Sequence, residues 1–201
     1  MSIPQPQTNV QRFARKPELV RFTVQEFPDL YLVGKCITLN IYHLNMINPL
    51  EVFWHQNFGE GLFEYLENAF AEVLYNNAYI GFTKGINDQE YVYVCGMLVR
   101  EDLEIPADLV KFQIPGGLVA ISWVQGNNFD LFTVAQKLSE TAMTEAGYEF
   151  DYTRAFEMEV YTLERYWQAD NQDGTRIIDY YNPVIVRQFD DEAGQKVFPD
   201  E

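Results

Sequence analysis

The sequence predicts an α+β fold in which two tandem β-α-β-β units form a shared antiparallel sheet, with helices on one side and a central ligand cleft. The same order of strand-like and helix-like segments occurs in both halves of the chain, and glycines end comparable strands in each. A chain of 201 residues with 47% hydrophobic residues can bury the core of one sizeable domain. Sequence identity between the halves is negligible, so the order of elements carries the inference.

The first unit starts with a long strand over residues 29–42, rich in β-branched and aromatic residues and introduced by Pro28. Apolar residues at helical spacing predict a helix from Pro49 onward. Gly59 and Gly61 are expected to divide it into two pieces, because glycine weakens a helix interior. Two strands then complete the unit, at residues 78–85 and 89–102.

The second unit repeats this order. Residues 109–126 predict a pair of strands around the turn Pro115-Gly116-Gly117. A helix follows, with asparagines before it and Gly147 as its stop signal. Residues 155–167 and 175–184 then predict two strands separated by a turn-rich segment.

These segments give the expected domain boundaries. Residues 1–20 are polar and lack periodicity, which indicates a flexible N-terminal arm. The domain is expected over residues 21–187, with units at about 21–102 and 103–187, followed by an acidic tail at 188–201.

The composition restricts the classes of function. Fourteen Lys and Arg against 30 Asp and Glu give a formal net charge of −16. Such a surface repels phosphate backbones and anionic lipid, so we expect no direct nucleic-acid binding and no membrane partner. The two cysteines and two histidines form no metal-ligand pattern, and no cofactor motif is present, so neither metal nor cofactor is expected. No apolar run is long enough for a signal peptide or a membrane span, which predicts a cytoplasmic protein.

Several short motifs in order resemble one family. The segments are LYLVGKCITLN, YVYVCGMLV, FQIPGGLVAISWVQG, EAGYEF and LERYW followed by IIDYYNPV. Over roughly residues 20–187 they are similar to the GyrI-like (gyrase-inhibitor-like) effector-binding domains, which share a SOUL-like duplicated β-α-β-β fold. The departures are Leu163, where the family has an aromatic residue, and Asn182, where an aliphatic residue is common. No helix-turn-helix segment precedes the domain, so the resemblance implies a free-standing form.

The resemblance implies a carboxylate in the binding cavity, at Glu164 in LERYW. If residues 157–167 form one strand, alternation places Glu164 with Met158 and Val160 on the apolar face. Glu157 and Glu159 fall on the other, more charged face, which is expected to meet solvent, but they remain rival candidates for the cavity carboxylate. The alternative for Glu164 is a solvated residue, or one paired with Arg176 across the turn.

A carboxylate in an aromatic pocket is costly to desolvate unless a cation compensates for it. A lipophilic cation would do so by ion pairing and by cation–π contacts worth about 0.5–2 kcal/mol each. Each candidate aromatic wall residue also has an ordinary reading as core: Trp54, Phe58, Tyr91, Tyr93, Trp123, Tyr166 and Tyr181.

The leading functional hypothesis is therefore a protein that binds hydrophobic, often cationic small molecules of the drug or toxin type, for sequestration or for transcription-linked sensing. A binding protein is favoured over an enzyme. The enzymatic alternative, implied by the same resemblance, is a hydrolase of strained cyclopropanoid genotoxins with Glu164 as its catalytic residue. A third hypothesis is an acidic protein that docks on gyrase or another DNA-handling enzyme; no particular protein partner is indicated.

Overall fold

The computed structural model describes residues 16–40, 49–127, 130–168, 175–190 and 196–197. The strands in chain order are β1 (Glu18–Phe27), β2 (Leu30–Asn40), β3 (Ala78–Gly85), β4 (Glu90–Val99), β5 (Val110–Ile114), β6 (Gly117–Gly126), β7 (Tyr148–Phe150), β8 (Glu157–Thr162), β9 (Arg176–Val186), β10 (Phe189–Asp190) and β11 (Lys196–Val197). The helices are α1 (Pro49–Gly59), α2 (Leu62–Ala69), α3 (Asp130–Glu145) and a π-helical turn, η1 (Leu163–Trp167).

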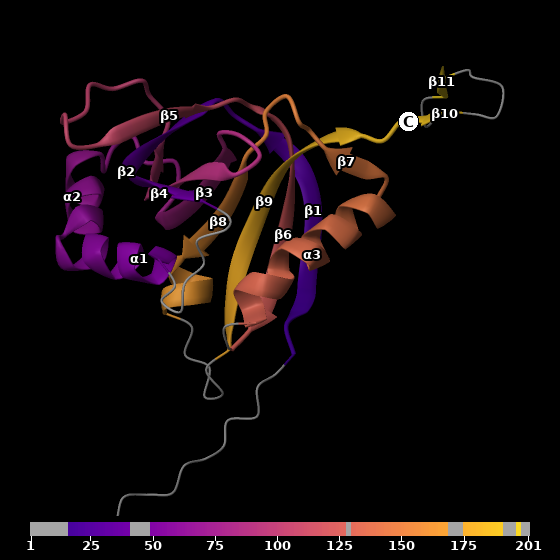
Figure 1. Ribbon diagram of the computed structural model, residues 1–201, viewed down its shortest axis with the longest axis horizontal. Coiled ribbons are helices and arrows are strands. Elements are labelled where there is room, and N and C mark those ends of the chain that lie inside the picture. Colours follow the sequence, from indigo (N-terminus) through magenta and orange to yellow (C-terminus); the bar gives the residue numbers. More distant parts are fainter. Residues whose placement is uncertain (1–15, 41–48, 128–129, 169–174, 191–195, 198–201) are drawn as a thin grey trace, which may run out of the picture.

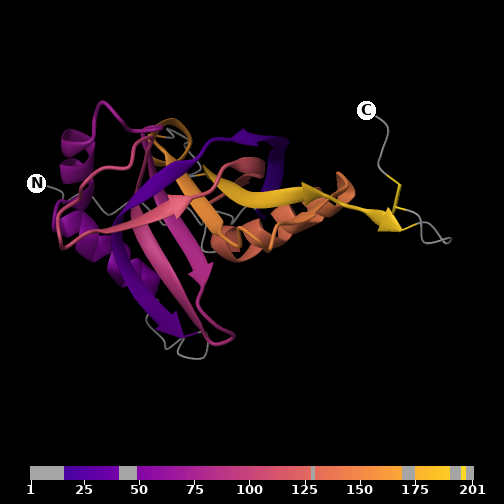
Figure 2. The same cartoon turned by 90° about the horizontal axis from the view of Figure 1, so that it is seen from above.

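The main sheet is antiparallel, in the order β1-β6-β9-β8-β3-β4-β2-β5, with β7 beside the far end of β9. The two units meet at the β3–β8 pair. The first strand of each unit pairs with a strand of the other unit: β1 pairs with β6, and β5 pairs with β2. The shared sheet predicted from the sequence is confirmed, and the exchange of strands ties its two halves together (Figures 1 and 2).

The helices lie on one side of this sheet. Helix α2 packs on β2 and β4 of the first unit, and α3 packs on β6 and β9 of the second (Figure 1). Helix α1 precedes α2 and packs against it. Residues on the opposite face form the largest core cluster, built around residues such as Leu32, Phe82 and Met158. The sheet therefore has a main core on one face and a helix-covered face with two smaller clusters on the other.

Most predicted elements lie where the sequence placed them. The predicted break between two helical pieces is confirmed, because α1 ends at Gly59 and α2 begins at Leu62. Gly61 has a φ of 75°, a left-handed conformation that glycine adopts without strain. Gly147 ends α3 as expected, with a φ of 81°.

Strand β1 was not predicted. It begins at Glu18, inside the segment assigned to a flexible arm, whereas residues 1–15 lie outside the described residues. Its side chains are partly exposed on both faces, so it lacks the strong alternation by which a strand is recognised. The predicted tail is described only at β10 and β11, which pair with each other.

The prediction of one strand over residues 155–167 was wrong beyond Thr162. The chain turns there into η1, and the side-chain oxygen of Thr162 accepts a hydrogen bond from the Arg165 backbone nitrogen. Gln168 N donates to Leu163 O at 2.6 Å and closes the wide turn. The alternation used to orient Glu164 therefore does not extend past residue 162.

Candidate functional site

Glu159 lies near the middle of the helix-covered face, where the two units meet. It belongs to β8 and is paired across the ladders with Gly81 of β3 and Tyr180 of β9. A Cβ atom at Gly81 would lie 2.2 Å from Tyr93 Oη and 2.9 Å from Glu159 Oε2. Glycine at position 81 thus leaves the space in which the tyrosine and the carboxylate meet.

Two tyrosines donate hydrogen bonds to this carboxylate, and one of them is linked to helix α1. Tyr161 Oη donates to Glu159 Oε2 at 2.7 Å, and Tyr93 Oη donates to the same oxygen at 3.1 Å. Trp54 Nε1 of α1 donates in turn to Tyr93 Oη at 2.9 Å. Helix α1 is therefore linked through one tyrosine to the carboxylate beneath it.

The surroundings make the charge on Glu159 costly. Burial raises the pKa of its carboxyl group, hydrogen bonds from Tyr161 and Tyr93 oppose that rise, and the neighbouring Glu157 adds to it. Burial likewise raises the pKa of Tyr93 and Tyr161 well above the ordinary value, so both hydroxyls remain protonated donors. Within the described residues, no Lys or Arg forms an ion pair with Glu159.

Aromatic rings surround the network. The rings of Trp54 and Tyr161 meet edge to face at 5.2 Å between centroids, and those of Tyr161 and Tyr166 at 4.8 Å. Contacts from ring to ring extend the group across α1, α2, β3 and η1; its further members are Phe58, Phe63, Tyr79 and Trp167. We call these seven residues, together with Tyr93, the aromatic cluster.

A second carboxylate, Glu157, lies on the same face of β8 as Glu159. Gln136 Nε2 of α3 donates to its Oε1 at 3.0 Å, and Tyr180 Oη donates to its Oε2 at 3.3 Å. Burial raises the pKa of Glu157, and the charge of Glu140 adds to the rise. Two carboxylates with raised pKa values therefore stand side by side between the α1 and α3 sides of the sheet.

The structure brings five of the aromatic residues predicted from the sequence to this site. Trp54, Phe58, Tyr93 and Tyr166 belong to the aromatic cluster. Tyr91 lies two residues from Tyr93 on the same strand face, and its pKa is raised by burial and by the charge of Glu159.

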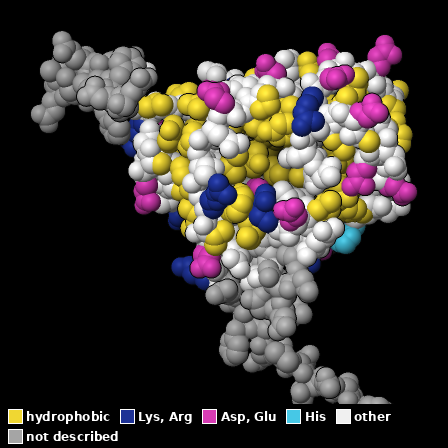
Figure 3. All heavy atoms as spheres, turned by 180° about the vertical axis from the view of Figure 1, so that it is seen from behind, with side chains coloured by type: hydrophobic (Ala, Val, Ile, Leu, Met, Phe, Trp, Pro, Cys, Tyr) yellow, Lys and Arg dark blue, Asp and Glu magenta, His cyan; other side chains and the backbone are white. Residues whose placement is uncertain are grey.

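Trp123 and Tyr181 are not part of this group. Both pack against the main core on the opposite face of the sheet. Trp123 is contacted there by two guanidinium groups, Arg165 at 4.2 Å and Arg21 at 4.6 Å from its centroid. Seen from behind, the molecule has an apolar hollow with basic side chains close by (Figure 3). Trp123 and Tyr93 therefore lie on opposite faces of the sheet.

Glu164 is exposed and lies in the π-helical turn rather than on a buried strand face. The neighbouring Arg165 forms an ion pair with the buried Asp179 of β9. Arg176 donates to Tyr166 O at 2.7 Å, and the ion pairs of the described residues do not include one between Arg176 and Glu164. Of the three candidate carboxylates, Glu157 and Glu159 lie on the helix-covered face of the sheet, and Glu164 does not.

Sequence reasoning missed four ring residues of the site: Phe63, Tyr79, Tyr161 and Tyr180. For Tyr161 the signal was present in Glu157-x-Glu159-x-Tyr161, an alternating row that was assigned to the solvated face because of its charges. The rule that charged strand faces meet water fails where tyrosines supply donors to the carboxylates.

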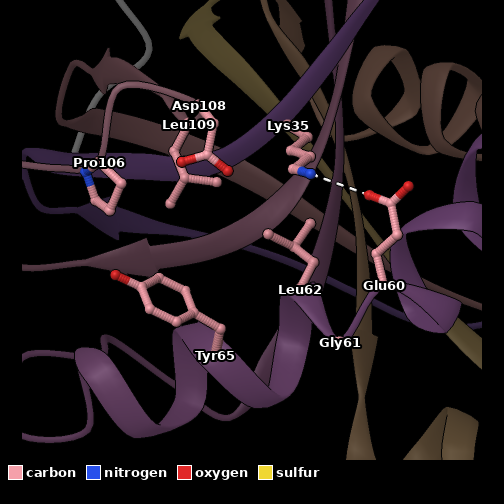
Figure 4. A pocket seen from close by; sticks show the side chains of 8 residues that line it. All are labelled: Lys35, Glu60, Gly61, Leu62, Tyr65, Pro106, Asp108 and Leu109. Carbon is pink, nitrogen blue, oxygen red and sulfur yellow. Dashed lines mark hydrogen bonds and ion pairs between the residues drawn. The ribbon is translucent and has the colours of Figure 1, made fainter.

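A separate cavity of about 310 Å³ lies between β2, the junction of α1 with α2, and the loop before β5. Figure 4 shows Lys35 pointing across it to Glu60, at 3.0 Å, with Leu62 and Tyr65 on one side. The Lys35 ammonium group in this cavity is already paired with Glu60, and no residue of the Glu159 network lines the cavity.

In the part of the chain that the structure describes, no three acidic, His or Cys residues are grouped as metal ligands. Its helices include none long and apolar enough to cross a membrane.

Comparison with known proteins gives one family match. The model of the family Cass2, described as integron-associated effector binding protein, matches residues 35–184. A search of curated proteins found no match.

Solved structures show the same fold at low sequence identity. SAV2435, solved bound to tetraphenylphosphonium, is 14% identical, with a TM-score of 0.59 over 83% of this chain and 94% of its own. The EcmrR C-terminal domain is 11% identical, with a TM-score of 0.54 over 83% and 98% of the two chains. An integron cassette protein from the mobile metagenome of Vibrio cholerae is 10% identical, with a TM-score of 0.52 over 85% and 100%.

Proposed function

Because the chain belongs to the integron-associated effector-binding proteins, a GyrI-like family, we propose that it binds lipophilic cations at Glu159. The ligand would lie between α1 and α3 on the helix-covered face, against the aromatic cluster. The observation that carries the proposal is the partly buried Glu159 carboxylate, held by Tyr93 and Tyr161 with no basic side chain as its ion-pair partner among the described residues. This assigns to Glu159 the counter-ion role that the sequence suggested for Glu164.

The energetics favour a cation of this kind. An ionised carboxylate removed from water loses several kcal/mol of hydration, and two tyrosine hydrogen bonds recover part of it. A cationic ligand would supply the missing opposite charge, and the ring faces of Trp54, Tyr161 and Tyr166 would supply cation–π contacts. A neutral ligand of the same shape would gain only from apolar burial.

The link from Trp54 to Tyr93 suggests how binding reaches α1. A ligand that takes the place of a tyrosine hydroxyl at Glu159 would break the hydrogen bond chain between the helix and the carboxylate. Helix α1 would then shift or loosen, which is a means of sensing for a partner protein; in a protein without a partner, the same site would sequester the ligand.

The decisive experiment uses tetraphenylphosphonium, and tetraphenylborate as an anion of the same shape, in calorimetric titrations. Glu159→Gln should weaken the cation about 10- to 100-fold, or about 1.4–2.7 kcal/mol, because the counter-ion is lost. It should leave the anion unchanged or bind it more tightly. Glu164→Gln, the matched change at the exposed glutamate, should alter the cation less than about twofold. The opposite ranking of the two variants would overturn the assignment.

One observation also keeps the hydrolase hypothesis open for testing. Burial raises the pKa of the Glu159 carboxyl group, and two tyrosine hydroxyls lie beside it, so it holds its proton to a higher pH than an exposed glutamate does, as suits a general acid. Under this hypothesis Glu159, rather than Glu164, would act on the strained ring. The test is turnover of a cyclopropane-bearing electrophile, which Glu159→Gln should abolish while the melting temperature stays within a few degrees of the wild type.

A further inference from the structure

A cavity of about 380 Å³ lies beside the Glu159 network, on the side of α3. Its acidic lining residues are Glu140, Glu149 and Glu157, and no Lys or Arg lines it. Its aromatic and apolar walls come from Tyr148, Phe150, Tyr152 and Met143. The cavity thus combines negative charge with apolar rings, as the Glu159 site does.

Glu157 joins the two regions. It lines the cavity beside α3, and it precedes Glu159 by two residues on the same face of β8. Tyr180 connects them as well, because it pairs with Glu159 in the ladder and donates a hydrogen bond to Glu157. A ligand bound at Glu159 would therefore have a second carboxylate, Glu157, next to it. No Lys or Arg lines the cavity on that side.

The two carboxylates repel each other. Each stands on the sheet between helices, where the dielectric is lower than in water, and the charge of Glu157 is felt at Glu159. Their hydrogen bond donors are neutral phenols and one amide. One monovalent cation would leave one of the two negative charges uncompensated.

Building on the proposed function, we infer that the site takes ligands with two cationic centres, one at Glu159 beneath α1 and the other at Glu157 in the cavity beside α3. Residues two apart on a strand have Cα atoms roughly 7 Å apart. The two cationic groups should therefore be joined by a short linker rather than a long one, and an aromatic substituent on each would reach the rings on its own side. The binding of two separate monocations is the competing arrangement.

The probe is a series of bis-quaternary compounds, two benzyldimethylammonium groups joined by two to ten methylenes. Each has a matched monocation in which one nitrogen is replaced by carbon. In wild-type protein the dication should bind at least about tenfold more tightly than its monocation, with one ligand per chain. The strongest binding is expected at about four to six methylenes, which span the strand distance above.

The variants separate this inference from the proposed function. Glu157→Gln should reduce the advantage of the dication to less than about twofold and leave the monocation unchanged. Glu159→Gln should weaken both. Glu104→Gln, an exposed glutamate in a distant loop, makes the same change in net charge and should affect neither.

The contrary results are also distinct. Equal affinity for dication and monocation in the wild type, or two monocations per chain at equal affinity, would overturn the inference and leave the Glu159 proposal intact. Loss of dication and monocation alike in Glu157→Gln would overturn it too. If Glu159→Gln weakens neither ligand, the proposed function itself fails. The linker series in the wild type decides the matter even if Glu157→Gln folds poorly.

Discussion

At the scale of single residues, the ligand binding proposed at Glu159 should be coupled to protonation. Its pKa is raised above the ordinary 4.5, chiefly by burial, so the folded protein binds this proton more tightly than the unfolded chain. The stability that this group contributes is therefore present below pH 4.5 and lost as the pH rises through the raised pKa. A cation bound at Glu159 would reverse the balance, because it would bind the ionised form.

This gives a pH dependence with a definite sign. The affinity for tetraphenylphosphonium should fall as the pH is lowered through the raised pKa, by up to about tenfold per pH unit, since protonation removes the counter-ion. Calorimetric titrations from pH 8 to pH 5 measure it. In Glu159→Gln the same titrations should give a much flatter profile, and an equally steep profile there would assign the proton to another group.

The face of β8 that carries Glu157 and Glu159 could be predicted from the sequence only in part. Strand parity correctly separated Met158 and Val160 from Glu157 and Glu159, and the structure places these pairs on opposite faces of β8. The error was to equate the charged face with solvent. The hydroxyl groups that stabilise the carboxylates on that face come from distant parts of the chain. Tyr93 is 66 residues from Glu159, and Tyr180 is 23 residues from Glu157. A single sequence does not show such contacts.

At the scale of elements, η1 connects the two faces of the sheet. Its Tyr166 and Trp167 belong to the aromatic cluster. Arg165, between Glu164 and Tyr166, reaches the other face and pairs with Asp179, which is 1% exposed. No periodicity predicts such a turn, and the ion pair that its Arg165 makes joins side chains 14 residues apart.

The Arg165–Asp179 pair is expected to hold η1 in place. Arg165→Met should cost about 3 kcal/mol of unfolding free energy, because it leaves a buried carboxylate without its partner and removes a contact with Trp123. The double variant Arg165→Met/Asp179→Leu should recover most of that loss, since apolar replacement of a buried pair is often neutral. Urea unfolding followed by circular dichroism measures both.

Arg176→Met serves as the control for this pair. Arg176 is exposed and contacts Tyr166 from the surface, so its loss should cost less than about 1 kcal/mol. If Arg165→Met costs no more than this control, the pair does not anchor the turn.

At the scale of the whole molecule, the resemblance to GyrI-like domains and the α+β class are confirmed by the family match and the shared fold. The repeated β-α-β-β order could be predicted because it rests on local periodicity. The exchange of β1 and β5 between the units could not, because strand partners are chosen by packing across the sheet. The boundary near residue 102 therefore separates segments of sequence, not independent halves of the structure.

The charge of the whole chain should act on charged ligands at a distance. A net charge of −16 creates a negative potential around the molecule, and acidic side chains are scattered over the face seen in Figure 3. This field should concentrate cations near the protein and repel anions. It is long-ranged only at low ionic strength, since the Debye length is about 30 Å at 0.01 M and about 10 Å at 0.1 M salt.

The association rate of a cation should therefore depend on salt more than its dissociation rate does. Between 10 mM and 500 mM sodium chloride, the association rate of tetraphenylphosphonium should fall about 3- to 10-fold, because screening removes the attraction at a distance. Its dissociation rate should change less than about twofold, because the contacts with Glu159 and the rings lie inside the protein. Stopped-flow measurements of tryptophan fluorescence can follow both rates through Trp54. Tetraphenylborate should show the opposite trend in association, and an equal fall for the two ions would mean that the field of the protein does not steer its ligands.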